Sequence, residues 1–201
     1  MSKNTIVITG SDGETAQGLI RYFSNHYNNI VGLSRRFKDT VISDNIAIMH
    51  ADMLDIDSID NVINQINSQY GIIDAWVNCV GGFSMGRLIE NENEDNWENM
   101  ARVNFMTCLN ACRFIIPYFK RNNSGCIINF GSKAALEGFS EAAPYLISKI
   151  SVHSLTQLIA IELDEYDVRC NAILPGIIDT NTNRKAMPNE DFNQWDSIDD
   201  I

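Results

Sequence analysis

Apolar and polar positions follow two different periods along most of the chain. Short apolar runs rich in β-branched residues, without polar alternation, are typical of strands buried on both faces of a parallel sheet. Six such runs predict strands at residues 5–9, 30–34, 46–50, 72–77, 126–130 and 168–174.

Segments with a helical period lie between these runs. Apolar residues spaced three or four apart predict helices around residues 16–23, 56–66, 97–112 and 152–163. Asp55 suits an N-cap, and Pro117 is expected to lie beyond the end of the third helix. Alternating strands and helices predict an α/β fold, a Rossmann-like doubly wound parallel sheet flanked by helices.

The alternation predicts one domain over residues 1–201, a length typical of a single domain. The pattern breaks after Leu174. Residues 179–201 carry scattered acids and only weak periodicity, and we interpret residues 176–201 as a substrate-loop region. Ser197 resembles the N-cap of a helix that the chain does not complete, so we expect either a shortened chain or a fold that ends early.

Composition narrows the possible partners. Acidic residues exceed basic ones by 26 − 15 = 11, so nucleic acid and membrane surfaces are not expected partners. We find neither a secretory signal nor an apolar stretch long enough to span a bilayer. The five cysteines form no CxxC pair, and Cys108 and Cys112 are interpreted as small buried residues, without a metal site. We therefore expect a reduced, cytoplasmic protein.

A glycine-containing loop follows the first predicted strand and precedes a helix. Glycines there allow a tight turn and the close approach of a pyrophosphate, which would bind at the helix N-terminus. The alternative is a sharp strand-to-helix turn that simply requires Gly10. The residues expected to bind a dinucleotide are Gly10, Ser11, Asp12, Gly13, Thr15 and Ala16.

The second predicted strand ends in Ser34, Arg35 and Arg36. An acidic residue at this point accepts hydrogen bonds from the adenosine ribose of NAD, whereas arginine accommodates the 2′-phosphate of NADP. The sequence therefore favours NADP (NADPH), with NAD as a possible cofactor. The alternative is a solvated arginine pair on a loop.

Further along the chain stand Asn104, Ser132, and Tyr145 followed four residues later by Lys149. With these residues, which match its active-site set, the chain resembles the short-chain dehydrogenase/reductase family from residue 5 to about residue 180. The resemblance also implies cofactor-binding roles for further residues, among which Ile178 and Thr180 would orient the nicotinamide carboxamide. These further residues are Asp52, Met53, Asn78, Val80, Gly81, Pro175, Gly176, Ile178 and Thr180.

The spacing of Tyr145 and Lys149 has a chemical meaning of its own. Residues at i and i+4 share one helix face, and an ammonium near a phenol lowers the pKa of the phenol. Tyr145 can then exchange a proton with a carbonyl or alcohol oxygen. By resemblance, Lys149 also binds the nicotinamide ribose, Ser132 hydrogen-bonds the substrate, and Asn104 supports a water relay. The alternative is a Tyr and a Lys on a solvated helix face, with Ser132 in an ordinary turn.

The glycine loop departs from the commonest family pattern because Glu14 and Ala16 occupy two glycine positions. Its spacing is similar to that of dihydropteridine reductase. Ala16 is compatible with helix–strand packing, and we expect Glu14 to point to solvent, away from a pyrophosphate. Family members also run further and close the sheet with another strand, which this sequence lacks.

The favoured function is an NAD(P)-dependent oxidoreductase that transfers hydride between nicotinamide C4 and a carbonyl or alcohol, with Tyr145 as general acid/base. The alternatives are a pteridine reductase and a non-catalytic NADP-binding regulatory protein. Residues 83–89, 133–143 and 177–195 are expected to surround an apolar or aromatic carbonyl compound, with Glu137 as the nearby acid. The resemblance implies a homodimer or homotetramer built on the helices of Asn104 and Tyr145.

Overall fold

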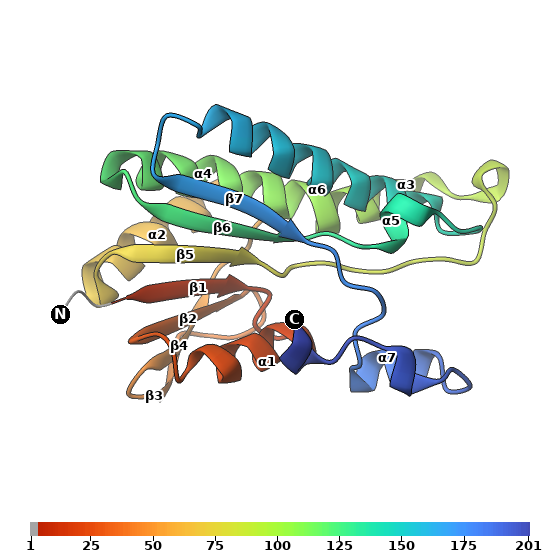
Figure 1. Ribbon diagram of the computed structural model, residues 1–201, viewed down its shortest axis with the longest axis horizontal. Helices are drawn as coiled ribbons and strands as arrows, with labels where there is room; N and C mark the ends of the chain where they lie inside the picture. Colours follow the sequence, from red (N-terminus) through yellow and green to blue (C-terminus); the bar gives the residue numbers. More distant parts are fainter. Residues whose placement is uncertain (1–3) are drawn as a thin grey trace.

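The computed structural model describes residues 4–201, which form helices around one seven-stranded sheet (Figure 1). The strand order is β3-β4-β2-β1-β5-β6-β7, with only β3 antiparallel to its neighbour. The strands are β1 (Thr5–Thr9), β2 (Asn29–Ser34), β3 (Thr40–Ser43), β4 (Ile46–His50), β5 (Ile73–Asn78), β6 (Gly125–Phe130) and β7 (Val168–Ile173). The predicted fold class is confirmed, as are all six predicted strands.

The helices place the connections on both faces of the sheet. The longer ones are α1 (Glu14–Phe23), α2 (Ile56–Tyr70), α4 (Thr107–Asn122) and α6 (Ala143–Glu162). The shorter ones are α3 (Glu94–Met100), α5 (Ala134–Glu137) and α7 (Asn181–Ala186), together with 3-10 turns at Ile89–Asn91, Phe192–Gln194 and Ile198–Asp200. Asp55 caps α2 by accepting hydrogen bonds from the backbone N–H groups of Asp57 and Ser58, as predicted.

The third predicted helix differs from the expectation in two ways. A π-helical turn at Ala101–Met106 separates α3 from α4, and α4 continues through Pro117. Proline inside a helix removes one hydrogen bond and costs about 3 kcal/mol. Ile115 and Phe119, which flank Pro117, are fully buried, and their burial offsets that cost.

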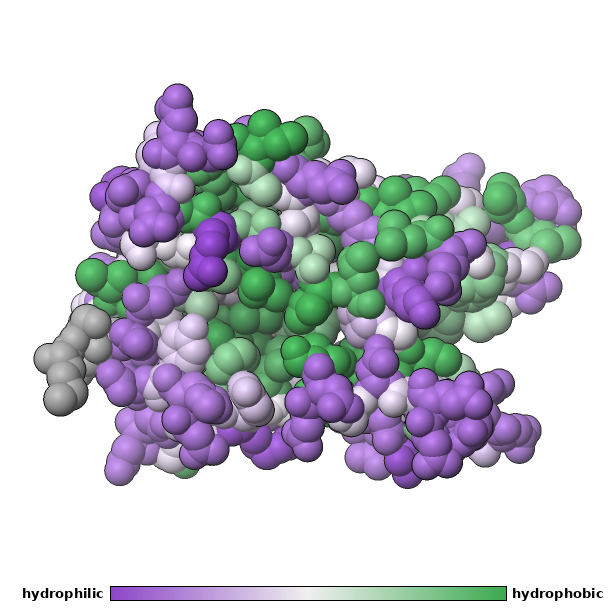
Figure 2. Space-filling model, viewed as in Figure 1, coloured by the Kyte–Doolittle hydropathy of each residue, from purple (hydrophilic) through white to green (hydrophobic). Residues whose placement is uncertain are grey.

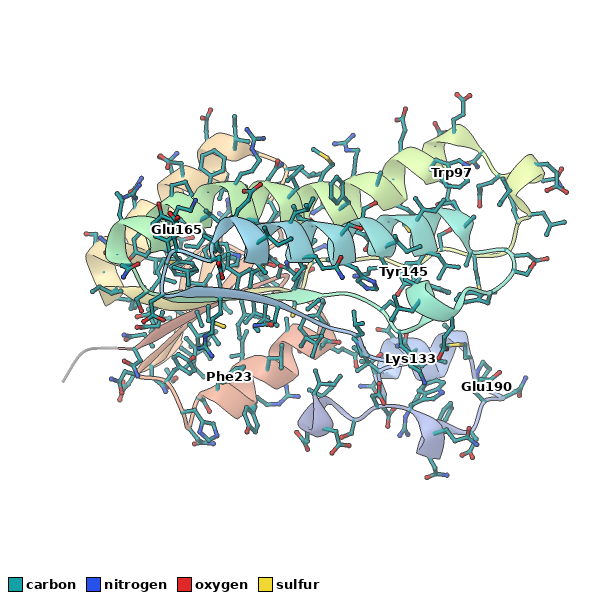
Figure 3. All side chains as sticks on the ribbon, turned by 45° about the horizontal axis from the view of Figure 1, so that its top comes forward. Phe23, Trp97, Lys133, Tyr145, Glu165 and Glu190 are labelled. Atoms are coloured by element: carbon teal, nitrogen blue, oxygen red, sulfur yellow. The ribbon has the colours of Figure 1, made fainter. Side chains whose placement is uncertain are left out.

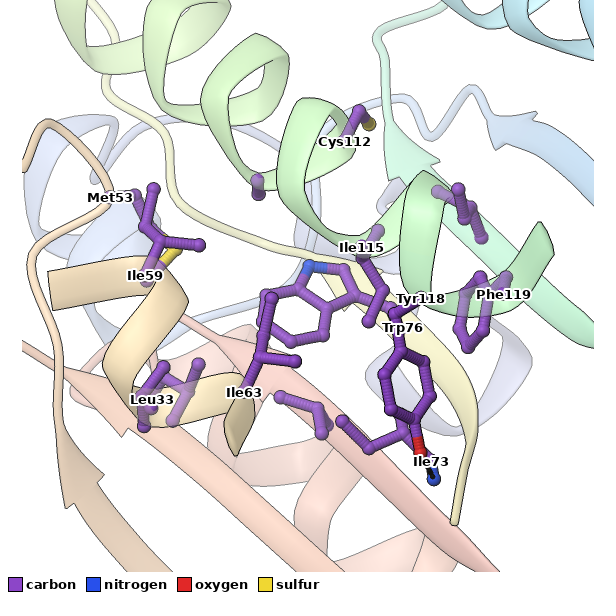
Figure 4. Packing of buried hydrophobic residues seen from close by; sticks show 14 of the residues in the cluster. Leu33, Met53, Ile59, Ile63, Ile73, Trp76, Cys112, Ile115, Tyr118 and Phe119 are labelled. Atoms are coloured by element: carbon purple, nitrogen blue, oxygen red, sulfur yellow. Dashed lines mark hydrogen bonds between the residues drawn. The ribbon is translucent and has the colours of Figure 1, made fainter. Parts of the chain in front are cut away.

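Two apolar layers hold the sheet between the helices. On one face α2, α4 and α6 pack against β-strand residues around Trp76, which is fully buried (Figure 4). On the other face α1 packs against Ile6, Ile8 and Ile30. Strands covered on both faces explain the continuous apolar runs in the sequence.

The segment after β7 returns to the α1 face. Asp196 pairs with Ile178 in an isolated bridge, and the Ile198 side chain lies against Gly18, where a Cβ would collide with it. The Ser197 hydroxyl accepts a hydrogen bond from the backbone N–H of Asp200, so the predicted cap exists but serves only a short 3-10 turn. No helix among residues 4–201 is long and apolar enough to cross a membrane.

Candidate active site

The glycine loop lies at the carboxyl end of β1 and opens onto a cleft of about 410 Å³. Gly10 has a φ of +71°, and the Gly13 N–H donates to the Gly10 carbonyl over 2.9 Å, which closes the turn. Because Gly13 precedes α1 without a side chain to cap it, the first N–H groups of α1 meet no side-chain acceptor from their N-cap. These features fit a phosphate-binding turn.

Ten of the predicted cofactor residues line this cleft together. They are Gly10, Asp12, Gly13, Ser34, Arg35, Arg36, Asp52, Met53, Val80 and Gly81. The opposite wall was not predicted from the sequence. It is formed by α3 and the π-helical turn, through Asp95, Glu98, Asn99 and Arg102. The cleft therefore runs from the glycine loop past the ends of β2 and β4, where a doubly wound sheet binds adenosine.

Three predicted cofactor residues of the glycine loop do not line the cleft, and two of them are buried. The Ser11 side chain is buried against Gly32, and its hydroxyl has no hydrogen-bond partner among residues 4–201. Ala16 is buried in the α1 core, as expected of the third position in the loop. Thr15, beside it, is half-buried and lies outside the lining of the cleft.

Asn78 belongs to a buried polar network and does not line the cleft. Its Oδ1 accepts a hydrogen bond from Trp76 Nε1 over 2.9 Å, and its Nδ2 donates to Asn129 Oδ1 over 2.8 Å. Asn129 in turn donates to Thr156 and contacts the thiol of Cys108. This network fixes the end of β5, from which the cleft residues Val80 and Gly81 follow.

Asn104 lies within the π-helical turn, and its side chain is buried. Its Oδ1 accepts the Gly82 N–H over 2.8 Å, while its Nδ2 donates to the Gly82 carbonyl and to Ser148 Oγ. The widened turn aims this carboxamide at the β5 loop and at α6 simultaneously. A Cβ at Gly81 would lie 3.1 Å from Asn104 Oδ1 and 3.4 Å from Lys149 Nζ, so Gly81 connects the cleft to both side chains.

Tyr145 and Lys149 share one face of α6, as predicted, and Figure 3 shows Tyr145 at the beginning of that helix. The Lys149 ammonium donates to the Phe130 carbonyl over 2.8 Å. Because the side chain is buried, its pKa falls to about 8. Burial raises the pKa of Tyr145, while a hydrogen bond with the Ser132 side chain acts in the opposite direction. The expectation that Lys149 lowers the Tyr145 pKa is therefore not met in this structure.

His153 is a site residue that the sequence analysis missed. Its Nε2 accepts the backbone N–H of Ser132 over 3.1 Å, so His153 holds the strand-end turn that presents Ser132. Burial and the nearby Lys149 lower the His153 pKa, which favours the neutral ring that this hydrogen bond requires. His153 follows Lys149 by four residues and continues the face of Tyr145, which was the available signal.

The C-terminal segment binds the glycine loop through Glu14. The Glu14 carboxylate accepts the backbone N–H groups of Asn181 and Thr182 and the Thr182 hydroxyl, at 2.8, 2.9 and 2.6 Å. As expected, Glu14 does not line the large cleft, and its contacts lie at the exposed surface. The donors that the first turn of α7 supplies to its carboxylate were not predicted. Thr180 caps α7 by accepting the Asn183 N–H.

The turn that begins at Pro175 is fixed by its own contacts. The Pro175 carbonyl accepts the Lys133 N–H, and the Gly176 N–H donates to Asp196. The Ile178 carbonyl accepts from the Asn183 amide. None of the four predicted residues Pro175, Gly176, Ile178 and Thr180 lines the large cleft.

A model of the short chain dehydrogenase family matches residues 4–191. The chain is 34% identical over 131 residues to a 2,3-dihydro-2,3-dihydroxybenzoate dehydrogenase of Bacillus subtilis, covering 65% of this chain and 50% of that protein. It is 26% identical over 185 residues to an uncharacterized oxidoreductase of Staphylococcus epidermidis, covering 90% and 80%. The chain spans about half the length of the first of these and of a 3beta-hydroxysteroid dehydrogenase of Mediterraneibacter gnavus that is 30% identical.

Solved structures of related fold superpose on this chain over most of its length. The ligand-free aldohexose dehydrogenase of Thermoplasma acidophilum superposes with a TM-score of 0.82 at 29% identity, covering 94% of this chain and 72% of that one. ElxO with NADP bound superposes with a TM-score of 0.88 at 22% identity, covering 98% and 87%, which shows the shared fold. The chain belongs to the short chain dehydrogenase family, a family of oxidoreductases.

Proposed function

We propose that the protein transfers hydride between a nicotinamide dinucleotide and the carbonyl or alcohol carbon of a small molecule. The observation that carries this proposal is the position of Gly81, which lines the cleft and has Asn104 Oδ1 and Lys149 Nζ beside it. Tyr145 lies one turn before Lys149 on α6, and the Ser132 side chain acts on the pKa of its phenol. A bound nicotinamide supplies the hydride chemistry, while the protein orients the reactants and moves the proton.

The residues of the chain have separate roles in proton transfer and in positioning the reactants. The effect of the Ser132 side chain on the pKa of Tyr145 supports a site in which both hydroxyls meet one substrate oxygen, at which Tyr145 Oη gives or takes the proton. In the structure Lys149 binds Phe130 instead of Tyr145, so we assign it to holding the nicotinamide ribose and maintaining positive charge behind Tyr145. Asn104 bridges the β5 loop and Ser148 and thereby supports the backbone beside Lys149.

The proposed cofactor is NADP, in preference to NAD. Arg35 and Arg36 both line the cleft at the end of β2, where a 2′-phosphate would bind. ElxO, which shares the fold, is described with NADP and NADPH bound, and this supports the assignment. The Pro175–Thr180 turn would complete the nicotinamide end of the site.

The substrate is proposed to be apolar or aromatic. The Phe83 ring meets the Tyr145 ring edge to face with 4.9 Å between centroids, and Phe83 is half exposed. Other exposed apolar side chains in the expected substrate segments are Met85, Leu136 and Phe139. Figure 2 shows apolar atoms gathered over the middle of the face around β7 and α6, whereas hydrophilic atoms cover α7. Glu137 pairs with Lys133 over 3.5 Å, an exposed contact that a substrate could replace.

We also propose a cytoplasmic homodimer or homotetramer. Along α6 one stripe of apolar side chains remains exposed, namely Ile147, Ile150, Leu158 and Ile161. A helix of a soluble monomer rarely exposes a continuous apolar stripe, so a second copy is its expected cover. Light scattering of the purified chain measures the oligomeric state, and the mass of a single chain, 22.6 kDa, would contradict the proposed oligomer.

The decisive experiment uses NADPH deuterated at C4 with a panel of aromatic and aliphatic ketones and aldehydes. Transfer of deuterium to the former carbonyl carbon of the product would support the proposal. The rate of this transfer should fall at least a hundredfold in Tyr145→Phe. Tyr22→Phe, which alters an exposed tyrosine on α1, is the matched control. Nucleotide binding without any deuterium transfer would favour a non-catalytic NADP-binding protein, and no nucleotide binding would overturn the proposal.

A further inference from the structure

Asp12 lies in the glycine loop, and its carboxylate binds the end of β2. Its Oδ1 accepts a hydrogen bond from Ser34 Oγ over 3.1 Å, and its Oδ2 pairs with Arg36 Nη1 over 3.2 Å. Ser34 Oγ also accepts the backbone N–H of Arg36 over 3.1 Å, so Asp12, Ser34 and Arg36 form one connected unit. All three line the large cleft.

This unit occupies the place where the choice between the two dinucleotides is made. In a doubly wound sheet, an acid at the end of the second strand accepts the adenosine ribose 2′-hydroxyl of NAD, and arginine there binds the 2′-phosphate of NADP. Here β2 ends in Ser34 followed by two arginines, and the glycine loop supplies the carboxylate.

The two arginines are not equivalent. Arg36 already pairs with Asp12, whereas Arg35 forms no ion pair with any residue in the described part of the chain. Arg35 is therefore the cation without an acidic partner, whereas Asp12 engages Arg36 through one guanidinium nitrogen, Nη1. A 2′-phosphate carries charge of the same sign as Asp12, so the two anions compete for Arg36 and repel each other.

We propose that Asp12 is the residue that discriminates between NADH and NADPH in this protein. Its carboxylate accepts the ribose hydroxyl of NADH, and it opposes the 2′-phosphate of NADPH by holding Ser34 and Arg36. The inference rests on the proposed dinucleotide-binding function. Asp12 moderates the preference that Arg35 and Arg36 create, and so keeps NADH an acceptable cofactor.

The test compares the Kd values of NADPH and NADH, measured by the fluorescence of each nucleotide, for the wild type and Asp12→Asn. Asparagine keeps an acceptor for Ser34 but removes the charge. We expect NADPH to bind more tightly and NADH more weakly, so that the ratio Kd(NADH)/Kd(NADPH) rises about tenfold, equivalent to about 1.4 kcal/mol. A rise of threefold or more supports the proposal, and a smaller change or a fall overturns it.

Two further variants separate charge from structure. Asp12→Glu retains the carboxylate and should change the ratio much less than Asp12→Asn does. Asp57→Asn removes an exposed carboxylate from the first turn of α2 and should leave the ratio unchanged. If Asp12→Asn weakens both nucleotides equally, Asp12 is structural and the proposal fails while the proposed function stands. If the wild type binds neither nucleotide, the proposed function fails as well.

Discussion

The Glu14 carboxylate accepts a 2.8 Å hydrogen bond from the backbone N–H of Asn181, although 167 residues separate the two. Glu14 opens α1 and Asn181 opens α7, so one side chain joins the start of the phosphate-binding helix to the segment expected to cover substrate. The Thr182 hydroxyl and the Asn181 N–H lower the pKa of Glu14 below its ordinary value of 4.5. The ionised form is therefore the one that the fold stabilises.

Glu14→Ala is expected to loosen α7 while leaving the sheet intact. Amide hydrogen exchange at Asn181 and Thr182 should accelerate by about tenfold, since both N–H groups lose their acceptor. Because the folded pKa is depressed, the Glu14 contribution is complete above about pH 5 and is lost as the pH falls through the folded pKa. The exchange rates of wild type and variant should therefore converge in acid.

The matched control for this variant is Glu90→Ala, which removes an exposed carboxylate from the 3-10 turn at Ile89–Asn91. It should leave exchange in α7 unchanged. Equal rates at Asn181 in the wild type and in Glu14→Ala at pH 7 would show that Ile198 and Asp196 hold the segment without Glu14.

The sequence predicted the elements that local pattern determines. The central strands β1, β2 and β5 are buried on both faces, so their apolar runs are continuous, whereas β7 alternates buried and exposed residues. β3 was missed because all four of its residues are exposed and show no alternation, and only pairing with β4 makes it a strand. The partners of Glu14 could not be predicted either, because they come from α7, far along the chain.

The site was predictable where its residues share a helix or a motif. Tyr145 and Lys149 are one turn apart, so their common face follows from spacing alone. Arg102 was missed because the cleft wall that it lines depends on how α3 packs across from the glycine loop. Asn78 was assigned to the cofactor, but burial turns its amide toward Trp76 and Asn129. Such directions depend on tertiary contacts, which a linear pattern does not contain.

Gly10→Ala is expected to destabilise the protein and to abolish nucleotide binding. The positive φ of Gly10 alone costs an L-residue about 1–2 kcal/mol. A Cβ there would also lie 3.1 Å from the backbone nitrogen of Val80, so the two strand-end loops would have to separate. Urea unfolding and NADPH titration measure the two effects.

Gly138→Ala is the control for Gly10→Ala, since Gly138 has a similar φ of +75° with no atom within 4 Å of the added Cβ. It should show the backbone cost without the loss of binding. Equal destabilisation by both variants, with NADPH affinity intact, would rule out a role for the close approach to Val80.

His153→Leu is expected to cost about 1–3 kcal/mol at pH 7, because the Ser132 N–H loses its acceptor. The wild type should also lose stability as the pH falls below the ordinary His value of 6.5, since the lowered pKa leaves the folded ring neutral while the unfolded one takes a proton. His153→Leu lacks this dependence. His50→Gln, an exposed histidine, is the control, and a pH profile shared by all three proteins would contradict the prediction.

Lys149→Met is expected to be inactive yet to change the pH dependence of stability in a defined direction. Burial lowers the Lys149 pKa from 10.5 to about 8, so the charged side chain destabilises the folded state at neutral pH. Between about pH 8 and pH 10.5 the unfolded chain holds a proton on Lys149 that the folded protein has released, so the Lys149 contribution to stability rises with pH in that window.

The increase in unfolding free energy with pH can be assigned to Lys149 only if the Lys149→Met variant does not show it. The unfolding free energy of the wild type should therefore increase relative to Lys149→Met by a few kcal/mol from pH 8 to pH 10.5, because one unit of pKa corresponds to about 1.4 kcal/mol. Subtracting the two profiles removes the titration of the groups that do not interact with Lys149, and the variant also removes the lowering effect of Lys149 on the pKa of Cys79. Lys185→Met, at the exposed end of α7, should match the wild type at every pH. Parallel profiles for the wild type and Lys149→Met would mean that the Lys149 ammonium is solvated and that its pKa is not lowered by burial.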